Sequence, residues 1–105
     1  MTSGMTIHAS VERYDRISAI IDLFNGDFGE TIIKVWEERR KTFQELTSNG
    51  IVIVRTADDT VITMYLCSVQ RAKFFRAASG KTLTRNQWKR IEANQKFAKL
   101  IEKSA

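Results

Sequence analysis

The residues from Gly50 to Ser68 constrain the fold more than any other part of this chain. Two runs within them, residues 51–55 and 61–66, are rich in the β-branched and aromatic side chains that favour strands. The residues between the runs are mostly short and polar, and such residues favour turns because their side chains bond to nearby backbone. We therefore predict an antiparallel hairpin. Its first strand is apolar on both faces, so we expect cover on both sides.

Two helices are predicted before the hairpin. In residues 10–24, apolar side chains recur every three or four positions behind Ser10, a favourable N-cap residue. Residues 25–26, Asn-Gly, end this helix because both tolerate the left-handed conformation of a helix C-terminus. The second helix is predicted to begin at Asp27 or Gly29 and to run to the next Asn-Gly pair. Its predicted buried face consists of Phe28, Ile32, Ile33, Trp36, Phe43 and Leu46.

Two more helices are predicted after the hairpin, over residues 68–78 and 85–104. Thr84 and Gln87 have the spacing of a capping box at the start of the second one. The predicted fold is therefore α+β, with two N-terminal helices, a central antiparallel β-hairpin and two C-terminal helices in a single domain, residues 1–105. The residue types of 5–8 permit a third short strand, and residues 1–4 are interpreted as a tail outside the fold.

Positive charge is concentrated in the last third of the chain. Residues 71–105 hold ten Lys/Arg and two Asp/Glu, whereas residues 1–70 hold seven and ten. In the last predicted helix the basic side chains follow one another at three- and four-residue steps, so they share a face. Such a face is typical of a helix that contacts nucleic-acid phosphates. The predicted nucleic-acid-binding residues are Arg76, Lys81, Arg85, Lys89, Lys96, Lys99 and Lys103.

The alternative interpretation of this face is an ordinary solvated helix surface, since lysine is a common surface residue. Trp88 likewise has two interpretations: it stacks on an exposed base beside Arg85 and Lys89, or it anchors the helix in the core. No apolar run approaches the length of a membrane span. The lone cysteine, Cys67, excludes an internal disulfide and a cysteine zinc cage, and we expect a cytoplasmic protein without a metal or cofactor.

A second group of residues has two interpretations: its lone histidine is an ordinary surface or capping residue, or the group is catalytic. The only histidine lies near the N-terminus, and arginines, a threonine and a tyrosine follow it in the order His8, Arg13, Arg16, Arg55, Thr63, Tyr65. Over roughly the first two thirds of the chain, this pattern and order resemble small phage and toxin nucleases of the barnase–EndoU–colicin–RelE superfamily. The chain departs from that family in showing one clear hairpin rather than a fuller sheet, and in the long helical segment that follows.

The resemblance implies a ribonuclease in which an RNA 2′-hydroxyl attacks the adjacent phosphate on an antiparallel sheet. It implies that His8 is the general acid or base. It implies that Arg13, Arg16 or Arg55 neutralises the phosphate and that Thr63 or Tyr65 orients it. The chain has no second histidine, and its carboxylates do not have the spacing of metal ligands, so the sequence does not predict a metal site.

Three functions are therefore consistent with the sequence. The first is a small nucleic-acid-binding or accessory protein of phage or mobile-element type, which contacts DNA or RNA through the C-terminal basic helix. The second is a metal-independent ribonuclease that uses His8. The third is a protein-interaction module, a host-directed inhibitor or a homo-oligomer, because a strand that is apolar on both faces is able to pair or pack against a partner.

Overall fold

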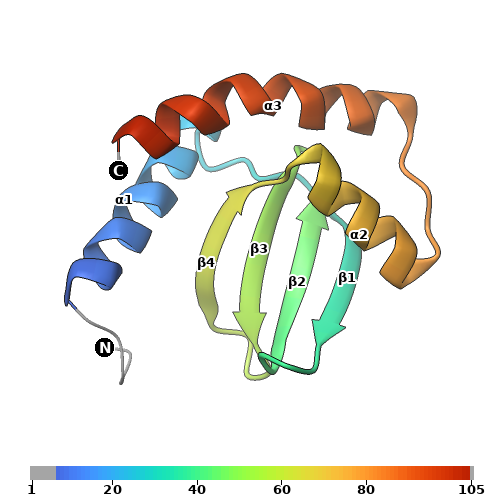
Figure 1. Ribbon diagram of the computed structural model, residues 1–105, viewed down its shortest axis with the longest axis horizontal. Coiled ribbons are helices and arrows are strands. Elements are labelled where there is room, and N and C mark those ends of the chain that lie inside the picture. Colours follow the sequence, from blue (N-terminus) through green and yellow to red (C-terminus); the bar gives the residue numbers. More distant parts are fainter. Residues whose placement is uncertain (1–6, 105) are drawn as a thin grey trace.

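The computed structural model describes residues 7–104, and the side chains of residues 16–98 within them. Four strands form one antiparallel sheet in the order β1-β2-β3-β4. In Figure 1, α2 crosses in front of one end of the sheet, α3 runs across that end, and α1 lies beside β4. The elements in chain order are α1 (Ile7–Phe24), β1 (Thr31–Glu37), β2 (Thr42–Thr47), β3 (Ile51–Thr56), β4 (Val61–Leu66), α2 (Val69–Ser79) and α3 (Arg85–Ser104).

The predicted hairpin is confirmed as β3 and β4, which pair antiparallel with Ile51 opposite Leu66. The predicted cover on both faces of β3 is confirmed as well. On one face Ile51 and Ile53 pack in a cluster with Ile20 of α1. On the other face Val52 packs in a cluster with helical residues of α2 and α3, among them Phe75.

The predicted second N-terminal helix is wrong. Residues 31–47 instead form β1, a turn and β2, so the α+β fold has three helices and four strands rather than four helices and one hairpin. The apolar residues of this segment happen to recur at helical spacing, but β1 and β2 also contain the β-branched residues that favour strands. Pairing decides between the two, because β2 bonds to β1 on one side and to β3 on the other.

The turn between β1 and β2 carried no signal in the sequence. It spans residues 38–41, which are charged and contain no glycine, proline or asparagine. Lys41 nevertheless adopts a positive φ of 54° there. A positive φ strains the backbone of a residue with a side chain, and contacts of Glu38 offset part of that strain. Its carboxylate pairs with the Lys41 ammonium and accepts a hydrogen bond from Trp36 Nε1.

The two predicted C-terminal helices are confirmed, and each has a side-chain cap at its start. Ser68 Oγ accepts a hydrogen bond from the backbone N–H of Arg71 at 3.0 Å, which caps α2. Thr84 and Gln87 form the predicted capping box, with bonds of 2.9 and 3.2 Å. At the other end of the chain, α1 begins at residue 7 rather than at Ser10. Residues 7–8 are therefore helical, not a third strand, and residues 1–6 lie outside the described part.

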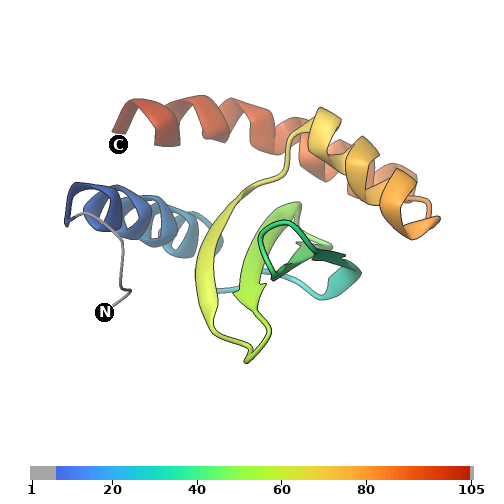
Figure 2. The same cartoon turned by 60° about the horizontal axis from the view of Figure 1, so that its bottom comes forward.

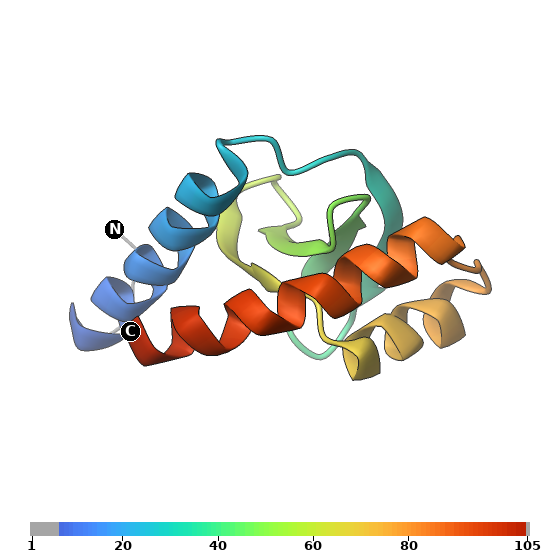
Figure 3. The same ribbon diagram turned by 90° about the horizontal axis from the view of Figure 1, so that it is seen from above.

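A close approach joins α3 to the turn between β2 and β3. Asn94 of α3 donates its Nδ2–H to the backbone oxygen of Asn49 at 2.8 Å. Gly50 is the next residue, with φ +79°, and a Cβ on it would lie 2.7 Å from Asn94 Nδ2. Only glycine allows both this backbone conformation and this contact. Figure 2 shows the resulting arrangement, in which α2 and α3 lie together along one side of the curved sheet, and Figure 3 shows α3 from above.

Candidate functional site

A cleft of about 490 Å³ lies on the face of the sheet that α2 covers only in part. The register of the strands explains its composition, because Gln44 pairs with Val54 and Val54 pairs with Thr63, so all three share that face. Arginines from α1 and from the β1–β2 turn complete the walls. We call this the sheet cleft; it is lined by Arg16, Arg40, Thr42, Gln44, Val54, Ile62, Thr63 and Tyr65.

A hydrogen-bonded network fixes one end of the sheet cleft. Tyr65 Oη accepts a hydrogen bond from Arg71 Nε and donates one to Gln44 Oε1, both at 3.2 Å. The Arg71 guanidinium also bonds to Gln44 Oε1, and it lies 3.6 Å from the carboxylate of Glu37. Since Gln44 is only 2 % exposed, this network is held between α2 and the sheet. Arg71 is therefore a cation in a fixed position.

Tyr65 is a hydrogen-bond donor in this network at neutral pH. Burial raises the pKa of its phenol above the ordinary value, and the neighbouring Arg71 opposes that shift only in part. The phenol consequently stays protonated. Its single O–H is already donated to Gln44 Oε1, so this network holds the end of the cleft in place rather than offering the phenol hydrogen to a ligand.

Two hydroxyl groups in the cleft have no described hydrogen-bond partner. Thr42 Oγ1 and Thr63 Oγ1 are both fully buried atoms, and neither meets a donor or acceptor among the described residues. Leaving a buried hydroxyl unpaired costs about 1–3 kcal/mol. Both hydroxyls belong to residues that line the same cleft as Arg16 and Arg40. The arrangement favours a small anion such as a phosphate group.

Of the six residues to which the resemblance gives a catalytic role, the structure brings together three, Arg16, Thr63 and Tyr65. Arg55 is not among them: its Nε lies 2.8 Å from Glu45, which faces away from the cleft. Asp59 approaches the same guanidinium at 3.6 Å. His8 and Arg13 belong to α1, but their side chains lie outside the described part of the structure.

Four residues of the site were missed from the sequence. Arg40, Thr42 and Gln44 were assigned to a helix that does not exist, so their position on a sheet was hidden. Arg71 was counted only as part of the basic C-terminal segment. The threonines and the phenylalanine of residues 42–47, which favour a strand, were the signal that could have located Thr42 and Gln44.

The helices carry a second basic region, which we call the α2–α3 basic surface. Its side chains are all exposed, and none forms an ion pair with another described residue. The described members are Lys73, Arg76, Lys81, Arg85, Lys89, Arg90 and Lys96. Of the predicted nucleic-acid-binding residues, Lys99 and Lys103 lie in α3, and their side chains are not described.

Trp88 connects the two helices at this surface. It is half-buried and packs against the core cluster that contains Phe75 and Ile91, as expected for an anchor of α3. Its remaining surface is approached by Arg76, whose guanidinium carbon lies 5.7 Å from the ring centroid. This cation–π contact orients Arg76 on the outside of the helices.

The described residues do not indicate a reactive thiolate or a metal site. Cys67 is buried, and burial raises the pKa of its thiol to about 12, so it is not a thiolate at neutral pH. Among the described residues, no group of three or more His, Cys, Asp or Glu is arranged to hold a metal ion. No described helix is both long and apolar enough to cross a membrane.

Comparisons with protein-family models, with curated proteins and with solved structures found no match to this chain.

Proposed function

We propose that this chain binds nucleic acid, DNA or RNA, through phosphate contacts from the α2–α3 basic surface. The observation that supports the proposal is the separation of charge in the fold. Among the described ion pairs, the carboxylates pair with Arg40, Lys41, Arg55 and Arg71, and none pairs with a member of the α2–α3 basic surface. These cations are therefore available to a polyanion, and each one that contacts a phosphate displaces a condensed counterion.

A titration at two salt concentrations tests this proposal. We expect the affinity for a labelled 20-nucleotide duplex to fall at least tenfold between 50 and 200 mM salt, because several phosphates are contacted at once. A triple variant, Arg76→Gln, Lys81→Gln and Arg85→Gln, should reduce the slope of log K against log salt by about one for each lost contact.

The matched control changes the same amount of charge elsewhere. Lys34, Arg39 and Lys41 are exposed cations of β1 and the turn after it, and their triple substitution by Gln should leave the slope unchanged. Binding that does not respond to salt contradicts the proposal. Equal losses in the two triple variants contradict it too, since net charge rather than the α2–α3 basic surface would then determine affinity.

The second candidate function is a metal-independent ribonuclease, and the sheet cleft is the observation that favours it. Arg16, Thr63 and Tyr65 were predicted to handle the phosphate, and all three line that cleft. In this proposal the 2′-oxygen bonds to phosphorus while the bond to the 5′-oxygen breaks. A base takes the proton of the 2′-hydroxyl and an acid protonates the leaving 5′-oxygen. His8, on the same helix as Arg16, is the candidate for one of these roles.

Incubation of labelled RNA with the protein in excess EDTA tests the second candidate. Wild type should cleave, and His8→Ala and Arg16→Gln should each lose at least a hundredfold in rate. Arg55→Gln is the control, because Arg55 is bound to Glu45 away from the cleft, and it should keep the wild-type rate. Wild-type protein that leaves the RNA intact, or His8→Ala that cleaves equally fast, contradicts this function.

A further inference from the structure

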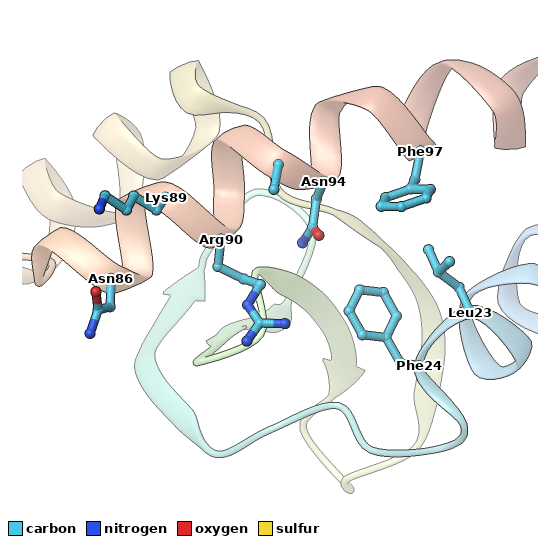
Figure 4. A pocket seen from close by; sticks show the side chains of 8 residues that line it. Leu23, Phe24, Asn86, Lys89, Arg90, Asn94 and Phe97 are labelled. Atoms are coloured by element: carbon cyan, nitrogen blue, oxygen red, sulfur yellow. The ribbon is translucent and has the colours of Figure 1, made fainter.

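A second groove, separate from the sheet cleft, lies between the end of α1 and the side of α3 that faces α1 and the sheet (Figure 4). Its volume is about 600 Å³, within the range of pockets that hold small organic ligands. Neither the proposed phosphate contacts nor the cleft accounts for it. The groove is lined by Leu23, Phe24, Asn86, Lys89, Arg90, Ala93, Asn94 and Phe97.

The two ends of this groove differ in chemistry. At one end Phe97 of α3 lies across from Leu23 and Phe24 of α1, as Figure 4 shows. Phe97 is 41 % exposed and Leu23 is 37 % exposed, so a large apolar surface is open to solvent there. At the other end Lys89 and Arg90 supply two positive charges. A ligand that fits this groove is flat and apolar at one end and anionic at the other.

We propose that the groove is a nucleotide subsite for single-stranded nucleic acid, in which one unstacked base lies against Phe97 and its phosphate meets Arg90 or Lys89. This inference rests on the proposed function, and it adds a preference for single strands. Charge complementarity and continuity both support the subsite, because Lys89 belongs to the groove and also to the α2–α3 basic surface. Aromatic side chains beside a basic track are typical of sites that bind single strands.

The groove is positioned by contacts that do not depend on a ligand. Asn94 forms part of its floor, and its amide is tied to the backbone of Asn49 at the β2–β3 turn. Phe24 packs against the core cluster of Ile20, Ile51, Ile53 and Met64, which places the opposite wall. Both walls of the groove are thus fixed to the sheet, so little conformational entropy of the protein is lost when a base enters.

Binding of one single-stranded oligonucleotide and of its duplex, measured with wild type and with Phe97→Ala, tests the inference. We expect Phe97→Ala to weaken single-strand binding on the order of tenfold, because it removes one stacking contact. Duplex binding should be unchanged, since paired bases are not available to the groove. The salt slope of single-strand binding should also be unchanged, because no phosphate contact is lost.

Three further variants make the test specific. Phe97→Leu keeps an apolar wall without an aromatic ring, and it should lose single-strand affinity almost as Phe97→Ala does. Arg90→Gln should lower both the affinity and the salt slope, the latter by about one. Val61→Ala, at a similarly exposed apolar residue of β4, should behave as wild type. Thermal melts of all variants confirm that each is folded.

The outcomes separate this inference from the function on which it rests. Salt-dependent binding by wild type, with no change in Phe97→Ala, overturns the nucleotide subsite and leaves the α2–α3 basic surface in place. Wild-type protein that binds neither oligonucleotide overturns both proposals. A selective loss of single-strand affinity in Phe97→Ala and Phe97→Leu supports the subsite.

Discussion

The sheet cleft and the α2–α3 basic surface are both basic, but they hold their charge in different ways. In the cleft region, Arg71 is bound by Glu37, Gln44 and Tyr65, so its guanidinium has one position. On the α2–α3 basic surface, the lysines and arginines are exposed and have no described ion-pair partner. A fixed cation suits a single anion in a defined orientation. A set of exposed cations without ion-pair partners suits a long polyanion, whose phosphates are contacted in many arrangements.

The largest expected effect on this comparison comes from removing Arg71. Arg71→Met should lower the free energy of unfolding by about 2 kcal/mol, because Tyr65 and Gln44 each lose a charged hydrogen-bond partner. Arg85→Met, on the exposed surface, should change it by less than about 0.5 kcal/mol. Urea denaturation of both variants measures the difference. Equal stabilities would mean that Arg71 is as loosely held as the helical cations.

A substitution at Gly50 tests the joint between the two regions. Gly50→Ala should destabilise the fold by about 1–2 kcal/mol, because φ is +79° there and the new Cβ would meet Asn94 Nδ2 at 2.7 Å. Gly26 has a similar φ of +75° but nothing within 4 Å of a Cβ, so Gly26→Ala controls for the backbone term alone. A Gly50→Ala loss no larger than the Gly26→Ala loss would contradict the close approach of α3.

The unpaired hydroxyls of the cleft should make Thr63→Val a stabilising substitution. Valine has nearly the shape of threonine, and removing an unpartnered buried hydroxyl should raise the free energy of unfolding by about 1 kcal/mol. The same variant should weaken binding of inorganic phosphate, measured by calorimetry, if the hydroxyl contacts the anion. Thr82→Val, at an exposed position between α2 and α3, is the control for a change of residue type. A destabilised Thr63→Val protein would show that the hydroxyl has a partner.

The smallest expected effect is the pH dependence that the buried Cys67 adds. Its thiol pKa is raised by burial to about 12 in the folded chain, so only the unfolded chain ionises near pH 9. The contribution of the buried thiol to the free energy of unfolding is therefore complete below about pH 9 and is lost as the pH rises towards 12. The loss is about 1 kcal/mol by pH 10. Denaturation curves of wild type and Cys67→Ala between pH 8 and 10 measure it. Parallel pH profiles for the two proteins would contradict the assignment.

The residues of the candidate site were predictable only where the local assignment was right. Thr63 and Tyr65 belong to the hairpin, whose strands were recognised, and Arg16 belongs to α1. Thr42 and Gln44 belong to β2, where apolar residues at helical spacing and a turn without glycine or proline favoured a helix. Arg55 was assigned to the site, but alternation along β3 places it on the opposite face from Val54.

The caps, the C-terminal helices, the hairpin and the uneven distribution of charge follow from the sequence alone, because each depends on residues a few positions apart. The β1–β2 pair, the two basic regions and the groove between α1 and α3 were decided by the tertiary structure. Their components lie far apart in the chain, as with Gln44 and Arg71, which meet only because β2 pairs with β3 and α2 folds back over the sheet. Strand pairing and helix docking are non-local, so a local pattern compatible with helix gives way where pairing and packing with distant segments favour a strand.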